Sequence, residues 1–127
     1  MSYDEMKLQI RCVTFFIYRY SELIWNHSPN EGKRSDKAGN TLKQMGMQKG
    51  WPDLEIISRD KTVFIEFKTT KGRQSESQKH IQLMIEKLGI AYYLCRTYQD
   101  FIEICHKEFG PEKDPDIERL KEILNSN

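Results

Sequence analysis

The stretch of sequence that decides the fold is GWPDLEIISRDKTVFIEFK, residues 50–68. Two short segments within it, Asp53–Ile57 and Thr62–Lys68, are rich in Ile, Val and Phe and flank the polar turn Ser-Arg-Asp-Lys. This pattern predicts two antiparallel strands joined as a β-hairpin. Both strands also carry charged residues, which a half-buried hairpin does not need for its own stability.

Strand geometry predicts that three of these charged side chains lie together. Because side chains alternate along a strand, Glu66 and Lys68 share one face of it. If Ile57 pairs with Thr62 across the turn, Asp53 lies directly opposite Glu66. Opposed cross-strand Cβ atoms are about 5 Å apart, and like charges at this distance are destabilising. The two carboxylates therefore need a positive charge beside them.

Either Lys68 or a divalent cation can supply that charge. Hard carboxylate oxygens at this spacing suit Mg²⁺ or Mn²⁺, and the sequence offers no nearby Cys/His cluster that would favour zinc. The alternative is that Glu66 and Lys68 are an edge pair kept on a solvent face for solubility. The additional Pro52-Asp53 at the start of the first strand favours the cation site, because three spaced residues must then coincide.

Elements on both sides of the hairpin complete an α/β pattern. A long first helix is predicted from a capping box of Ser2 and Glu5 and from apolar residues at steps of three and four, namely Met6, Ile10, Val13, Ile17, Tyr20 and Ile24. A loop follows from residue 26 to 40, with a short helix at Lys37–Met45.

After the hairpin, a basic turn at Thr69–Gln74 leads to a helix. This helix is predicted to begin with a capping box of Ser75 and Gln78 and to end at Gly89. Its apolar face is predicted to be Ile81, Met84, Ile85 and Leu88. Next comes a strand at Ile90–Arg96, which is predicted to lie parallel to a neighbouring strand. A helix at Tyr98–Phe109 follows. A last helix begins at Asp114-Pro115, with Ile117, Leu120 and Leu124 facing inward. The predicted fold is a small mixed sheet with helices on both faces.

Composition indicates one globular domain that spans residues 1–127. Hydrophobic residues make up 38% and charged residues 31% of the chain, and no apolar segment is long enough to cross a bilayer. The acidic, polar N-terminus does not resemble a signal peptide. Cys12, Cys95 and Cys105 are odd in number and lie in apolar surroundings, which predicts reduced core thiols and a cytoplasmic protein.

The net charge of +1 is unevenly distributed. Residues 32–50, which include Lys49, hold five Lys or Arg residues against one acid, whereas residues 98–127 hold twice as many acids as bases. Lys71, Arg73 and Lys79 extend positive charge beyond Lys68. The distribution predicts a basic face for a polyanion such as DNA, and a randomly uneven solvated surface is the alternative.

These motifs resemble the PD-(D/E)xK nuclease superfamily, with Pro52-Asp53 followed by Glu66-Phe67-Lys68. More narrowly, the chain is similar to virus-type replication-repair nuclease (VRR-NUC) domains in KGWPDL (49–54), FIEFK (64–68), the turn at Gly72 with Ser75 and Gln78, and the strand AYYLCRT. The resemblance covers about residues 5–109 and leaves 110–127 as a C-terminal helical extension. Trp51 departs from the family, which more often has a small aliphatic residue there.

The resemblance implies a restriction-endonuclease-like core and a phosphodiesterase that depends on Mg²⁺ or Mn²⁺. In that interpretation Asp53, Glu66 and the backbone carbonyl of Phe67 bind the cation, and Lys68 orients the attacking water. Glu5 is implied as a further metal ligand and Gln78 as a supporting residue. Both also complete capping boxes, so a purely structural role is the alternative for each.

The loop that follows the first helix is implied to face the substrate, with His27, Asn30, Lys33 and Arg34 as its DNA contacts. A solvated connection is the alternative. The family further implies a structure-specific endonuclease of branched DNA, similar to Holliday-junction resolvases and active as a homodimer. A non-catalytic nucleic-acid-binding module on the same fold is the competing hypothesis.

Overall fold

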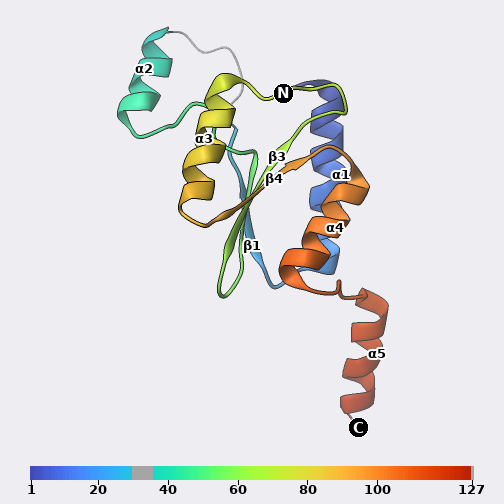
Figure 1. Ribbon diagram of the computed structural model, residues 1–127. Helices are drawn as coiled ribbons and strands as arrows, with labels where there is room; N and C mark the ends of the chain where they lie inside the picture. Colours follow the sequence, from blue (N-terminus) through green and yellow to red (C-terminus); the bar gives the residue numbers. More distant parts are fainter. Residues whose placement is uncertain (30–35, 127) are drawn as a thin grey trace.

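A computed structural model describes residues 1–29 and 36–126 and contains nine elements (Figure 1). In chain order they are α1 (Tyr3–Arg19), β1 (Ile24–His27), α2 (Asp36–Gln44), β2 (Leu54–Ile57), β3 (Thr62–Phe67), α3 (Glu76–Lys87), β4 (Ala91–Cys95), α4 (Tyr98–Phe109) and α5 (Pro115–Asn125). The predicted α/β fold class is confirmed.

The four strands form one mixed sheet in the order β1-β2-β3-β4. The hairpin has the predicted register, since β2 and β3 are antiparallel and Ile57 pairs with Thr62 and Leu54 with Ile65. The helical crossover through α3 makes β4 parallel to β3, as predicted, and pairs Glu66 with Leu94. Continuing this register by one residue past the Leu54–Ile65 pair brings Asp53 opposite Glu66.

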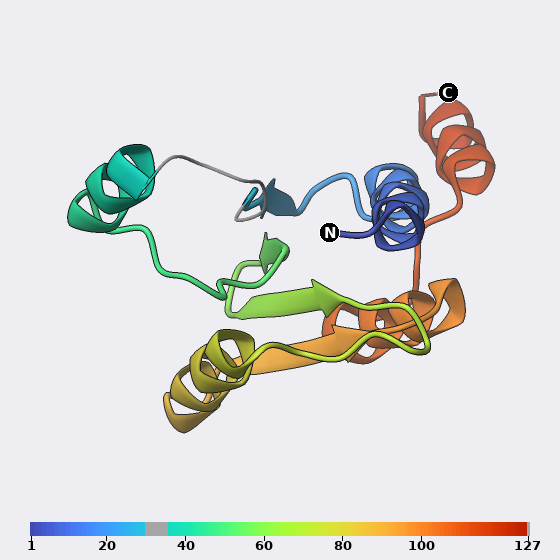
Figure 2. The same cartoon turned by 90° about the horizontal axis from the view of Figure 1, so that it is seen from above.

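Helices cover both faces of the sheet (Figure 2). Alternate residues of β3 serve the two sides: Val63, Ile65 and Phe67 pack with α1 and α4 in the larger core, and Phe64 packs with Ile81 and Ile85 of α3 in the smaller one. Trp51 packs on the smaller core, edge to face with the ring of Phe64 at 5.5 Å between centroids. Trp51 therefore has a packing role.

The three cysteines are free thiols and completely buried in the larger core. Cys12 comes from α1, Cys95 from β4 and Cys105 from α4, so they lie where the two helices meet the sheet. The prediction that they are core residues is confirmed.

The first helix is shorter than predicted, and the strand that follows it was not predicted. The helix ends at Arg19, and Ile24–His27 forms β1, an edge strand that pairs antiparallel with β2. Helical periodicity continues through Ile24 by coincidence. Trp25 favours the strand over a longer helix, because its ring packs edge to face on Phe16, at 5.6 Å between centroids, and holds the returning chain against the helix.

The predicted buried face of the first helix is only partly right. Tyr20 is buried as predicted and Val13 packs against the larger core, but the rest of the face is turned by about one residue. Cys12 and Phe16 are buried, whereas Met6 and Ile10 are exposed, Ile10 by 57%. The same stripe toward the sheet contains Glu5 and Gln9, which are both buried. In α3, Ile81 and Ile85 are buried as predicted, but Met84 and Leu88 are exposed.

The C-terminal helix α5 extends away from the sheet and its helices (Figure 1). It begins at Asp114-Pro115 as predicted, but it has no buried residue, and Ile117, Leu120 and Leu124 are exposed rather than inward. The segment before it is attached to the end of α1, where the Lys113 N–H donates to the Arg19 carbonyl at 3.1 Å.

No helix among the described residues is long and apolar enough to cross a membrane.

Candidate active site

All the buried acidic, basic and amide side chains of the described residues belong to one region, at the end of the molecule where α1 and α3 begin. They are Glu5, Gln9, Asp53, Glu66 and Lys68. A charged group inside a protein costs free energy unless it is paired or bound to a metal. The concentration of such groups in one place is therefore the feature of this fold that most requires a functional explanation.

Asp53 and Glu66 are the centre of this region, with 3% and 0% of their surfaces exposed. The backbone N–H of Phe67 donates to Oδ2 of Asp53 at 2.8 Å, which holds the Asp53 carboxylate against β3. Both carboxylate oxygens of Glu66 are buried and have no hydrogen-bond partner. A buried carboxylate in this state lacks the stabilisation that its charge requires.

Electrostatics at Glu66 show the same imbalance. Burial, and next the neighbouring carboxylate of Asp53, raise the pKa of Glu66 well above its ordinary value, and Glu5 adds to this effect. Lys68 opposes it, but more weakly. Three acids thus share one lysine, and a cation bound here would restore the charge balance.

Lys68 and Glu5 lie together beneath the turn that follows β3. A methyl group placed on Gly72 would be 3.2 Å from Oε1 of Glu5 and 3.4 Å from Cδ of Lys68. Glu5 also closes the predicted capping box, because the N–H of Ser2 donates to its Oε2 at 3.4 Å. The capping interpretation of Glu5 is therefore confirmed for Oε2, and Oε1 lies beside Gly72.

Gln78 is in a different situation. Its Oε1 accepts from the N–H of Ser75 at 2.8 Å, and the N–H of Gln78 donates to the Ser75 hydroxyl at 3.2 Å. The capping interpretation of Gln78 therefore accounts for its side-chain oxygen. Gly50, with φ +85°, packs against this helix start, where a Cβ would be only 2.5 Å from the Ser77 carbonyl carbon.

Arg96 holds the turn over Lys68 and was not predicted as a site residue. Its Nη1 donates to the carbonyls of Thr69 at 2.6 Å and Gly72 at 2.8 Å. Nothing in the sequence next to Arg96 indicates this role, because its two acceptors are backbone groups more than 20 residues away.

His27 lies at the end of β1, with its ring next to Asp53. Its Nδ1 is 2.8 Å from the Asp53 carbonyl oxygen and 2.9 Å from Nε2 of Gln9. Of the other predicted DNA contacts, Lys49, Lys71, Arg73 and Lys79 are exposed. Asn30, Lys33 and Arg34 lie outside the described residues.

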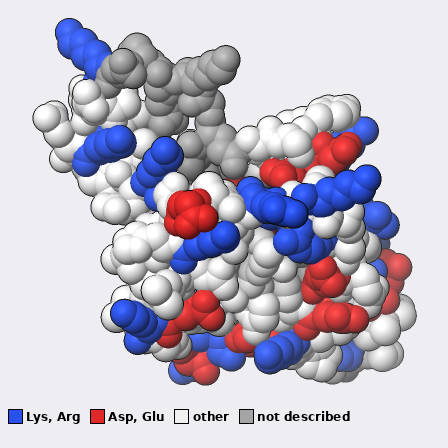
Figure 3. All heavy atoms as spheres, turned by 45° about the horizontal axis from the view of Figure 1, so that its top comes forward, with Lys and Arg blue, Asp and Glu red and all other residues white. Residues whose placement is uncertain are grey.

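Basic side chains are scattered over the surface at this end of the molecule. Figure 3, in which this end comes forward, shows Lys and Arg side chains in several groups, with acidic side chains between them. The basic surface is therefore discontinuous, and the exposed bases nearest in sequence to Lys68 are Lys71 and Arg73, on the turn that Arg96 holds.

The side chains that are present suit a hard divalent cation. No three His, Cys, Asp or Glu side chains among residues 1–29 and 36–126 are grouped so as to hold a metal by themselves. Mg²⁺ and Mn²⁺ do not need such a group, because one or two carboxylates with waters and substrate phosphate oxygens complete their coordination. The orphaned oxygens of Glu66, next to the oriented carboxylate of Asp53, meet this requirement.

Comparison with known proteins identifies the fold. One solved structure, a VRR_NUC domain protein, is similar over 90% of this chain and 99% of its own, with a TM-score of 0.69 and 19% sequence identity. No family model matches the sequence. No curated protein matches it either. The chain therefore has the fold of a VRR-NUC domain.

Proposed function

We propose that this protein is a metal-dependent nuclease of the PD-(D/E)xK type that hydrolyses phosphodiester bonds in DNA. The observation that carries the proposal is the pair of buried carboxylates at the end of the hairpin, with both oxygens of Glu66 unpartnered beside the anchored Asp53. The fold shared with a VRR_NUC domain protein supports it.

Each residue of the region has a distinct task in this proposal. Asp53, Glu66 and the Phe67 carbonyl would hold Mg²⁺ or Mn²⁺, and Glu5, whose charge acts on Glu66, would be a further carboxylate for the ion. A cation bound there would supply charge neutralisation at the scissile phosphate and a water of lowered pKa. Lys68, buried beside Glu66, orients that water and stabilises the hydroxide as it attacks.

The substrate is proposed to be branched DNA, cut by structure rather than sequence in the manner of Holliday-junction resolvases. The phosphates are contacted by exposed or loop residues, which supplies affinity without sequence information: Lys49, Lys71, Arg73 and Lys79, with Asn30, Lys33 and Arg34. A homodimer would provide the two active sites that paired cuts need. Buried reduced thiols favour an intracellular setting.

A non-catalytic DNA-binding module is the alternative, and the pKa of Glu66 is the observation that favours it. A metal-free site can lower its charge by keeping Glu66 protonated. The anchored Asp53 and the buried Lys68 argue against it, because a protein that only binds phosphates gains nothing from acids placed near them.

The test is incubation of the purified protein with labelled linear, flap and four-way DNA, each with Mg²⁺, Mn²⁺ or a chelator. We expect cleavage only with the cation, and a loss on the order of 10²-fold or more in Asp53→Asn, Glu66→Gln and Lys68→Met. Glu55→Gln, on β2 of the same hairpin, is the matched control and should cleave normally.

Retained binding of four-way DNA by the inactive variants would show that the changes affect chemistry alone. No cleavage by the parent with either cation, together with intact DNA binding, would favour the non-catalytic module. Light scattering of the protein with and without four-way DNA measures the proposed dimer separately.

A further inference from the structure

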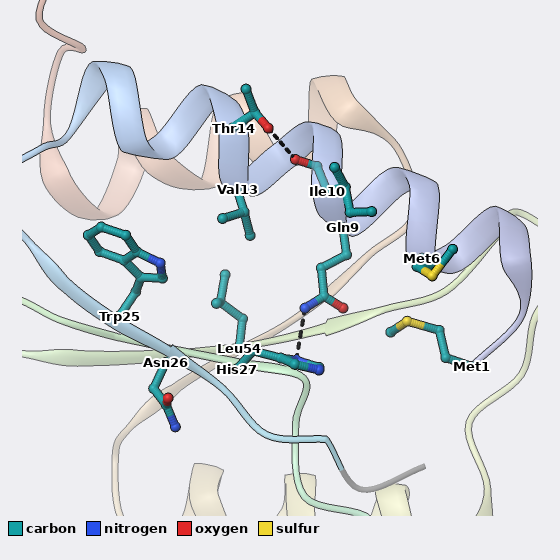
Figure 4. A pocket seen from close by; sticks show the side chains of 10 residues that line it. All are labelled: Met1, Met6, Gln9, Ile10, Val13, Thr14, Trp25, Asn26, His27 and Leu54. Carbon is teal, nitrogen blue, oxygen red and sulfur yellow. Dashed lines mark hydrogen bonds between the residues drawn. The ribbon is translucent and has the colours of Figure 1, made fainter. Parts of the chain in front are cut away.

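One ring nitrogen of His27 makes two contacts, and the two contacts require different protonation of that nitrogen. Nδ1 is 2.9 Å from the terminal amide of Gln9, the contact drawn in Figure 4. The same nitrogen is 2.8 Å from the carbonyl oxygen of Asp53. The same carbonyl also accepts from the N–H of Ser28 at 3.0 Å. This arrangement joins α1, β1 and the start of β2 at the residue that carries a central carboxylate.

Hydrogen-bond chemistry determines the proton on this ring. A carbonyl oxygen can only accept, so Nδ1 must carry the hydrogen to bond Asp53, and the ring then cannot accept from an amide NH₂. A half-turn of the Gln9 amide resolves the conflict by presenting its oxygen to Nδ1–H. That oxygen is the atom of Gln9 that is otherwise buried without a partner.

The position of Asp53 explains why such support is needed. The β1–β2 ladder ends at the pair His27–Leu54, so Asp53 lies one residue beyond the last paired position. Its carboxylate is held from one side by the Phe67 N–H and its carbonyl from the other by Ser28 and His27. Gln9, 8% exposed and in the turn of α1 after Glu5, holds the ring.

We propose that His27 and Gln9 are positioning residues: they fix the backbone of Asp53 and so set where its carboxylate meets a metal ion. The inference rests on the proposed function, because it assumes that Asp53 is a metal ligand. It departs from the sequence-based expectation, in which His27 contacts DNA. The two roles involve different ring nitrogens, since Nδ1 faces Asp53 and only Nε2 is left to meet a phosphate.

Two substitutions separate these nitrogens. Asn has its amide nitrogen at the δ position, so His27→Asn keeps a donor where Nδ1 lies. Gln has its amide nitrogen at the ε position, so His27→Gln keeps a donor where Nε2 lies and loses the bond to Asp53. His27→Ala removes both. His106→Ala is the control. His106 lies on α4 and is paired with Glu112.

The first measurement is Mn²⁺ binding by calorimetry, without DNA. We expect His27→Ala and His27→Gln to weaken binding roughly 10-fold, the size of effect seen when the outer hydrogen-bond partners of metal ligands are removed. Gln9→Leu should weaken it less, and His27→Asn should bind nearly as well as the parent. DNA affinity in chelator should be unchanged in all four.

The second measurement needs no metal. The ¹⁵N resonances of the His27 ring in the metal-free protein should show a hydrogen on Nδ1 and a bare Nε2 when the ring is neutral. A ring protonated on Nε2 would overturn the inference.

So would Mn²⁺ binding that is equal in His27→Ala and the parent, or a pattern in which His27→Gln is tolerated and His27→Asn is not. A parent that binds no Mn²⁺ would overturn the proposed function as well. A parent that binds Mn²⁺ regardless of His27 would overturn this inference alone.

Discussion

At the scale of single residues, the site combines a carboxylate that is hydrogen-bonded with one that is not. Asp53 accepts from the backbone N–H of Phe67, whereas the oxygens of Glu66 have no partner. The hydrogen bond fixes the position of the Asp53 carboxylate, and the unpartnered Glu66 carboxylate needs a positive charge beside it. Both properties can be measured without assuming catalysis.

Asp53→Ala and Asp53→Asn should differ in stability. Alanine leaves the buried N–H of Phe67 without an acceptor, which costs about 1–3 kcal/mol, whereas the amide oxygen of asparagine can still accept. Urea unfolding in chelator measures the difference. Equal midpoints for the two variants would show that this hydrogen bond adds no net stability.

Glu66 should make the metal-free protein less stable as pH rises. Its folded pKa is raised from 4.5 to about 9, so between these values the unfolded state releases a proton that the folded state retains. The contribution of Glu66 to the free energy of unfolding is therefore fully present below about pH 4.5 and is lost as pH rises through about 9.

Thermal unfolding in chelator at about pH 5.5 and about pH 8.5 is the measurement. The melting temperature of the parent should fall by several degrees between them, and that of Glu66→Gln should fall less. Glu55→Gln should behave as the parent does. A parent whose melting temperature rises over this range would contradict the raised pKa of Glu66.

At the scale of elements, the turn between β3 and α3 connects the fold to the site. Arg96 of the segment after β4 holds the carbonyls of Thr69 and Gly72, and Gly72 packs on Glu5 and Lys68. A segment of irregular backbone is thereby fixed above the buried charges, and it carries Lys71 and Arg73 at its surface.

Arg96→Met should loosen this turn without unfolding the sheet. The N–H of Gly72, which donates to the Thr69 carbonyl at 3.1 Å, should exchange with solvent on the order of 10-fold faster, while N–H groups of β3 keep their protection. Hydrogen exchange of the metal-free protein measures both. Arg59→Met, at the exposed hairpin turn, is the control, and unchanged exchange at Gly72 would remove Arg96 from this role.

At the scale of the whole molecule, stability resides in the sheet and the helices α1, α3 and α4. Two aromatic-rich cores lie between them, and α5 contributes no buried residue to either. The C-terminal helix is therefore an addition to a domain that is already complete.

Deletion of residues 115–127 should leave folding intact. The truncated chain keeps Lys113 and its hydrogen bond to Arg19, and we expect its melting temperature to stay within a few degrees of the parent's. Calorimetry and the Mn²⁺ titration measure stability and the site together. A large drop in melting temperature would show that α5 packs on the domain in solution.

Local rules were sufficient for the hairpin and for the helix starts. The register that sets Asp53 beside Glu66 follows from the turn and the alternation of side chains, and both capping boxes, at Ser2 and Ser75, form as predicted. These features depend on residues a few positions apart, so the sequence contains what determines them.

Other features depend on which surfaces meet. Helix α1 has apolar residues on two neighbouring stripes, and only packing on the sheet and α4 selects Cys12 and Phe16 over Met6 and Ile10. That choice rotates Glu5 and Gln9 inward. The edge strand β1 likewise exists because Trp25 packs on Phe16 and β2 offers a free edge.

The sequence by itself therefore determined the pair of acids, the lysine that follows them and the hairpin that holds them, because a strand's geometry is local. Only the tertiary structure decided that Gln9 and Arg96 join them, and where Glu5 and His27, which the resemblance had singled out, lie. Each of these side chains reaches the site across more than 15 residues of sequence or from another element, and the free energy that brings it there comes from burying distant apolar surfaces together.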